Sequence, residues 1–113
     1  MNIDTIFEKI IRREIPAKIV YEDDFCLAFH DIQPQAPIHI LLIPKKKIQD
    51  LFSLQKEDQA LIGHLMECIP EIAKKLGIRE FRLISNCGSS AGQSIFYLHF
   101  HLLGGREFSW PPG

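Results

Sequence analysis

Two histidines near the end of the chain have a spacing that can do chemistry. His99 and His101 are separated by one residue within an apolar run, and alternate side chains of a β-strand point to the same face. Their Cα atoms would then lie about 7 Å apart. The spacing leaves three interpretations open: a divalent-metal site, because imidazole is a common ligand, a catalytic pair with one nucleophilic ring, or polar residues on a half-buried face.

Other residues bear on these interpretations. A metal site would need a third protein ligand, for which His30, His39 and His64 are candidates. His64 falls between the apolar stripe and the polar face of a predicted helix, and we expect no special role for it. The Gly/Ser loop at residues 88–92 precedes the histidines, so its amides and the Ser94 hydroxyl are candidates for binding an anion.

The strands that must position these groups are predicted where short apolar or alternating runs are bounded by turn residues. They cover residues 18–21, 25–31, 39–43, 81–86 and 95–103. On the last strand one face is wholly apolar and is expected to be core, with Phe96, Leu98, Phe100 and Leu102. The opposite face carries Ile95, Tyr97, His99, His101 and Leu103.

Two helices complete the prediction. Residues 4–11 form a short amphipathic helix that Asn2 or Asp4 could cap. Residues 56–76 form a long helix that ends at Gly77, and we expect Pro70 to kink or break it near residues 66–69. The chain is therefore expected to be a single α+β domain over residues 1–113, with a mostly antiparallel sheet of about five strands.

Composition narrows the class of protein. The formal net charge of −1 over 113 residues argues against broad electrostatic binding to nucleic acid or to an anionic membrane. No apolar run approaches the ~20 residues of a membrane-spanning helix. The first twenty residues are too charged for a signal sequence, and Cys26, Cys68 and Cys87 form no CxxC motif. We therefore expect reduced thiols and a cytoplasmic location.

A longer pattern surrounds the two histidines. Residues 92–106, GQSIFYLHFHLLGGR, followed by WPPG at 110–113, closely resemble the signature of the histidine-triad (HIT) superfamily. Within it the chain resembles the Hint branch, the purine nucleoside phosphoramidases. The N-terminal half agrees with that branch at DTIF (4–7), EIPA (14–17), FHDI (29–32), QAP (35–37) and HILLIPKK (39–46). The resemblance covers nearly the whole chain.

The resemblance implies a hydrolase that cleaves the bond between the α-phosphorus of a purine nucleotide and an amine, releasing AMP or GMP. His99 matches the nucleophile, which forms a nucleotidyl-imidazole intermediate and divides one displacement into two. A main-chain carbonyl within the triad holds its other ring nitrogen. His101 matches the histidine that contacts the α-phosphate, His39 the one that supports the nucleophile, and Ser94 the residue near phosphate and leaving group.

The nucleotide-binding residues follow from the same resemblance. Asp31 matches the carboxylate that accepts hydrogen bonds from the ribose hydroxyls, and Asn86 and the Gly92 main chain match phosphate-side contacts. The base pocket is matched by Phe7, Ile10, Phe29, Ile32 and Leu41. Without the resemblance these five would be assigned to ordinary core.

The chain departs from the family pattern at two places. Tyr97 stands where the first triad histidine is usual, and we expect catalysis to survive because that position contributes mainly its carbonyl. Thr5 and Glu8 stand where some bacterial relatives carry a zinc-binding CxxC. We therefore expect no metal and no cofactor.

The resemblance also implies a homodimer, paired through the long helix and a central strand into one continuous sheet. Trp110 would reach the leaving-group side of the partner's site. Three alternatives remain open: a non-catalytic nucleotide-binding regulatory module, a dinucleoside polyphosphate hydrolase of the same superfamily, and a metal-dependent hydrolase that uses His39, His99 and His101.

Overall fold

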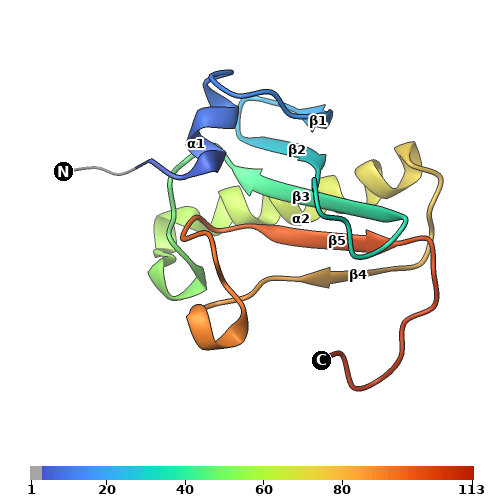
Figure 1. The fold of residues 1–113 in the computed structure, drawn as a ribbon. Coiled ribbons are helices and arrows are strands. Elements are labelled where there is room, and N and C mark those ends of the chain that lie inside the picture. Colours follow the sequence, from blue (N-terminus) through green and yellow to red (C-terminus); the bar gives the residue numbers. More distant parts are fainter. Residues whose placement is uncertain (1–3) are drawn as a thin grey trace.

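Five strands form one antiparallel sheet in the computed structural model, which describes residues 4–113 (Figure 1). The strands are β1 (Ile19–Glu22), β2 (Cys26–His30), β3 (Ile38–Pro44), β4 (Phe81–Ile84) and β5 (Phe100–Gly104). Their order is β1-β2-β3-β5-β4, and every neighbouring pair is antiparallel. The predicted α+β fold is confirmed.

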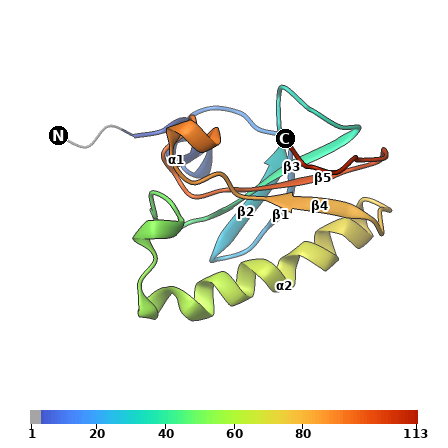
Figure 2. The ribbon, with the colours of Figure 1, turned by 90° about the horizontal axis from the view of Figure 1, so that it is seen from below.

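Two α-helices, α1 (Ile6–Ile11) and α2 (Gln59–Lys75), accompany the sheet. Single 3₁₀ turns lie at Leu51–Ser53, Lys56–Asp58 and Ser89–Ala91. Helix α2 runs along one face of the sheet (Figure 2), where apolar residues of β2, β3 and β5 pack against its buried side. A second apolar cluster joins α1 to the opposite face. Alternation of side chains along each strand thus supplies two separate cores.

The cap of α1 differs from the prediction. Thr5, not Asp4, precedes the first turn, and its hydroxyl accepts a hydrogen bond from the Phe7 amide (3.2 Å). Glu8 returns a bond by accepting from the Thr5 amide (2.8 Å), which makes a capping box. This reciprocal pairing satisfies two amides at once, an advantage that Asp4 lacks. Asn2 lies outside the described residues.

Helix α2 is continuous through Pro70, so the predicted break near residues 66–69 is wrong. The missing proline amide removes one helical hydrogen bond, but Cys68, Ile69 and Ile72 around it are buried against the sheet and hold the helix in place. The predicted end at Gly77 is confirmed. Gly77 has φ 74°, and the next amide, that of Ile78, returns to the Ala73 carbonyl (3.0 Å).

The last strand begins later than predicted, at Phe100 instead of residue 95. The Leu98 amide donates to the Ile48 carbonyl (2.7 Å), outside the strand ladder, and the chain bends there. Leu98, Phe100 and Leu102 are buried as expected, but Phe96 is 45% exposed and does not belong to the core. Within residues 4–113, no helix has the length and apolar character needed to cross a membrane.

Candidate active site

Strands β3 and β5 bring two histidines together from distant parts of the chain. Their register sets Leu41 opposite His101 and His39 opposite Leu103, so the two histidines are diagonal neighbours on one face of the sheet. His39 Nε2 lies 2.9 Å from His101 Nδ1. The face they share is that of α1, opposite to the face covered by α2.

His99 joins this pair from the bend just before β5. Its Nδ1 lies 2.6 Å from the main-chain carbonyl oxygen of Tyr97. A carbonyl only accepts hydrogen bonds, so Nδ1 carries the proton and Nε2 keeps its lone pair. The ring is 7% exposed, and its centroid lies 5.0 Å from the ring centroids of both Phe7 and His101. His99 is therefore held in the tautomer that a nucleophilic imidazole needs.

A chain of hydrogen bonds also sets the tautomers of the other two rings. The Gln35 amide donates to His39 Nδ1 (3.0 Å), which must therefore be unprotonated. The proton of neutral His39 is then on Nε2, which donates to His101 Nδ1. His101 is left with its own proton on Nε2, a donor suited to an anionic oxygen. Asp31 Oδ2 lies 3.4 Å from His39 Nε2.

Burial keeps these imidazoles neutral. It lowers the pKa values of His39 and His99 below that of a free imidazole, although Asp31 opposes both shifts and the Tyr97 carbonyl opposes the second. Burial, with repulsion from His99 and His39, lowers the pKa of His101 to about 4. All three rings are thus uncharged at pH 7, as nucleophilic attack by His99 requires.

Tyr97 contributes its main chain to this site and its side chain to the core. The phenol is fully buried and donates to the Pro44 carbonyl, and its ring meets Phe7 edge to face at 5.9 Å. The side chain therefore points away from the histidines, while the carbonyl holds His99. Ser85 supports the same segment, because its hydroxyl donates to the His99 carbonyl (3.0 Å).

A cavity of about 380 Å³ opens beside the histidines, within the size range of small-molecule sites. Its lining includes most of the predicted site residues, namely Phe7, Ile10, Phe29, Asp31, Ile32, Leu41, Ser94, His99 and His101. Ile32 is 89% exposed and forms the rim instead of a buried wall. The cavity is also lined by Ile15, Pro16 and Ala17. We did not assign these residues to the site from the sequence, because none of them has a polar side chain.

The glycine-rich loop at residues 88–92 does not line the cavity. Asn86 and Gly92 lie against each other but do not line the cavity. The amides of Ala91, Gly92 and Gln93 all donate to carbonyls within the loop, so these three are not free to bind an anion. Gln93 holds the loop closed. Its buried amide accepts from the Gly88 amide (2.8 Å) and donates to the Gln49 carbonyl (2.9 Å). Sequence reasoning gave this glutamine no role.

Among residues 4–113, two groups of side chains have the composition of a metal site. Asp31, His39 and His101 offer ligand atoms within 4.8 Å of one another, but a direct hydrogen bond joins the two imidazoles. His99 is not part of that group. The arrangement therefore differs from the alternative in which His39, His99 and His101 together bind a metal ion. The second group, Asp23, Cys26, His64 and Cys68, lies elsewhere.

Trp110, 83% exposed, does not line the cavity of its own chain.

Comparisons with known proteins show the family of this chain and support its fold. Residues 12–108 match the HIT domain family. HIT-like proteins described as uncharacterised, from Synechocystis sp. and Synechococcus elongatus, are 62% and 57% identical over the full length of both chains. A HIT family hydrolase from Legionella pneumophila superposes with a TM-score of 0.94 at 43% identity, covering 97% of this chain and 100% of its own. Another, from Clostridium thermocellum, gives 0.92 at 40%, covering 96% of each chain.

The neutral histidines predict a pH dependence of stability. Below about pH 6.5 an unfolded histidine binds a proton, whereas folded His101 stays neutral until the pH approaches 4. The unfolded state then binds more protons, so the free energy of unfolding falls as the pH falls. Between pH 7.5 and 5.0 we expect His101 to account for a loss of about 1 kcal/mol or more.

Denaturant unfolding of wild type and His101→Gln at both pH values measures this loss. The variant should lose less stability than wild type over the same interval. Equal losses in the two proteins would show that His101 titrates in the folded state as it does in the unfolded chain.

Proposed function

Because the chain belongs to the HIT domain family, with HIT family hydrolases among its structural relatives, we propose that it is a purine nucleoside phosphoramidase of the Hint type. The substrate would be a nucleoside monophosphate joined through phosphorus to an amine. The observation that carries the proposal is the hydrogen bond from His99 Nδ1 to the Tyr97 carbonyl, which leaves Nε2 as an unprotonated nucleophile in a ring that lines the cavity.

The proposed reaction has two displacements at phosphorus. His99 Nε2 forms a bond to the α-phosphorus as the bond from phosphorus to the amine nitrogen breaks, and the departing amine takes up a proton from solvent. Water then attacks the nucleotidyl-imidazole and gives up a proton to solvent, which releases the nucleoside monophosphate and restores His99. His101, with its proton on Nε2, would donate to a phosphate oxygen in both steps, and Ser94 at the cavity wall would lie near the leaving group.

The rest of the cavity suits a nucleoside. Asp31 lines it with a carboxylate that is 19% exposed and accepts one bond from the Gln33 amide (2.8 Å). A carboxylate has enough acceptor sites to take both ribose hydroxyls as well. Phe7, Phe29 and Leu41 offer flat and branched apolar walls for a purine.

We also propose that two chains pair through β4 and α2. Strand β4 is at an edge of the sheet in one chain and would become a central strand of a continuous sheet in the dimer. Two apolar side chains on it, Phe81 and Leu83, are 38% and 37% exposed. Phe81 lines a groove with Pro70 and Lys74 of α2, so helix and strand offer one shared surface. Trp110 would then extend from this surface to the partner's leaving-group site.

Hydrolysis of an adenosine phosphoramidate with a fluorescent amine tests the proposed activity. With chelator present, wild type should turn over, and His99→Ala should lose about a thousandfold or more in kcat because the nucleophile is gone. His64→Gln is the matched control, since it removes a histidine of α2, the helix that packs on the other face of the sheet.

The outcomes separate the candidate functions. Inert wild type that still binds AMP would favour a nucleotide-binding regulatory module. Faster cleavage of a dinucleoside polyphosphate than of the phosphoramidate would favour a dinucleoside polyphosphate hydrolase. Loss of activity in chelator would favour a metal-dependent enzyme.

Substitution of Tyr97 tests whether its carbonyl serves the active site while its side chain serves only the core. Tyr97→Phe keeps the ring but removes the hydroxyl that donates to the Pro44 carbonyl, and should cost about 1–2 kcal/mol of stability. It keeps the carbonyl that holds His99, so kcat should change by less than about threefold. Denaturation and steady-state kinetics measure the two effects. A rise in kcat by orders of magnitude in Tyr97→His would contradict this assignment, because it would show that an imidazole is needed at this position.

The dimer is tested by light scattering at low micromolar concentration. Wild type should have the mass of two chains, and Leu83→Lys should shift it toward one, because a charge would be buried at the interface. Phe52→Lys, a change at a 93% exposed aromatic in the 3₁₀ turn after β3, is the control and should stay dimeric. A monomeric wild type, or dissociation by Phe52→Lys alone, would contradict the proposed interface.

A further inference from the structure

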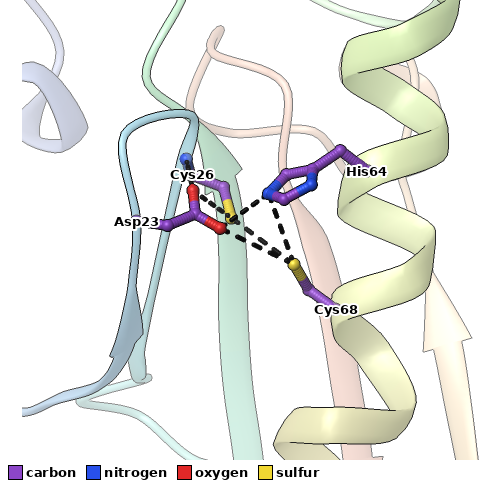
Figure 3. A group of neighbouring side chains, drawn as sticks. All are labelled: Asp23, Cys26, His64 and Cys68. Atoms are coloured by element: carbon purple, nitrogen blue, oxygen red, sulfur yellow. Dashed lines mark hydrogen bonds and ion pairs between the residues drawn. The ribbon is translucent and has the colours of Figure 1, made fainter.

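Four side chains from two distant segments converge on the α2 side of the sheet (Figure 3). Asp23 and Cys26 flank the turn between β1 and β2. His64 and Cys68 are four residues apart on α2, a spacing that puts them on one face of the helix. In Figure 3 all four point toward a common centre, and their ligand atoms lie within 4.8 Å of one another.

Two of the sulfur distances are close to those of a tetrahedral zinc site, and a third, from Cys68 Sγ to Asp23 Oδ2, is longer at 4.0 Å. With zinc–sulfur bonds of about 2.3 Å, two sulfurs at the corners of a tetrahedron lie roughly 3.75 Å apart. The Sγ atoms of Cys26 and Cys68 are 3.8 Å apart, and Cys68 Sγ is 3.7 Å from His64 Nε2. One edge is too short. His64 Nε2 and Asp23 Oδ2 are 2.6 Å apart in a direct hydrogen bond, against about 3.3 Å around a zinc ion. For zinc to bind, these two half-buried side chains must move apart, and the movement needed is less than 1 Å.

The surrounding residues hold the potential ligands in position, as outer-shell partners of metal sites do. Asp23 Oδ1 accepts from the amides of Phe25 (2.8 Å) and Cys26 (2.9 Å), and Asp23 Oδ2 accepts from the Tyr21 phenol (2.7 Å). Phe25 meets the His64 ring edge to face at 5.3 Å. Cys26 and Cys68 are buried, while His64 and Asp23 keep side-chain exposures of 35% and 24%. An ion can therefore reach the buried thiols past His64 and Asp23.

We propose that this group, the thiolates of Cys26 and Cys68 with His64 Nε2 and the Asp23 carboxylate, binds one zinc ion that links the β1–β2 turn to α2. Two sulfurs, one imidazole nitrogen and one carboxylate oxygen favour zinc over magnesium or calcium, which prefer oxygen ligands. With four protein ligands the site is closed, as structural zinc sites are. Binding forms two zinc–sulfur bonds and releases the two thiol protons to solvent, and the proton that His64 Nε2 donates to Asp23 moves to Nδ1 so that Nε2 can bind the ion.

The proposal reverses the sequence-based expectation of no metal. That expectation considered Thr5 and Glu8, which form the capping box of α1, and Glu8 also pairs with Lys47 (3.2 Å). The site proposed here lies on the opposite face of the sheet from the catalytic histidines. It does not depend on the proposed phosphoramidase activity.

Cobalt and zinc binding by the full chain tests this site. The chain is purified, stripped with a chelator under reducing conditions and titrated with Co²⁺. Wild type should bind one ion with thiolate-to-cobalt charge-transfer absorption, which the other candidate group, Asp31, His39 and His101, cannot give because it has no sulfur. Zn²⁺ should displace the cobalt one for one, and saturating zinc should raise the Tm by about 5 °C or more.

Matched variants assign the signal to its residues. Cys68→Ser should weaken the charge-transfer absorption and the zinc-dependent rise in Tm, whereas Cys87→Ser, at the half-buried third cysteine, should keep both. His64→Gln leaves both thiols in place and should weaken metal affinity at least tenfold. Circular dichroism of each metal-free variant shows that it is folded.

Three results would overturn the proposal. The first is a folded wild type without stoichiometric zinc or charge-transfer absorption. The second is a signal lost in Cys87→Ser and kept in Cys68→Ser. The third is a disulfide between Cys26 and Cys68. The intact protein would then have a mass lower by two hydrogen atoms than its sequence requires, and the disulfide would form again after reduction even in the presence of zinc.

Discussion

The pairing of β3 with β5 is the constraint on which the candidate active site depends. It places His101 opposite Leu41 and diagonal to His39, although the two histidines are 62 residues apart in the chain. A slip of one residue would turn every side chain of β5 to the other face. His101 would then enter the core under α2, and Leu102 would face the cavity. Burial of Ile40, Leu42 and Leu102 against α2 therefore holds the histidines on the opposite face.

Burial performs two tasks in this small fold. It supplies the apolar contacts between α1 and the sheet, and it also lowers the pKa values of the three histidines. Phe7 shows both, because it packs against Phe29 and Tyr97 while its ring meets His99 at 5.0 Å. The wall of the cavity is thus part of the core, and a change that loosens α1 would alter the protonation of the nucleophile as well as the stability.

The sheet separates two polar groups that have different chemistry. On the α1 face, hydrogen bonds set the tautomers of three imidazoles beside an open cavity. On the α2 face, two buried thiols, an imidazole and a carboxylate surround a common centre. The first arrangement suits turnover of a bound substrate. The second suits a fixed ion that ties a turn to a helix, since all four of its possible ligands come from the protein.

The sequence by itself determined the fold class and most of the cavity lining, because local periodicity and a long motif carry that information. It also placed the end of α2 at Gly77, where a left-handed residue was needed. Only the tertiary structure decided the rest. Whether Pro70 breaks α2 depends on packing against the sheet, and the start of β5 depends on the bond from Leu98 to Ile48. Cys26 and Cys68 meet only because α2 crosses the β1–β2 turn, and a contact over 42 residues leaves no local pattern in the chain.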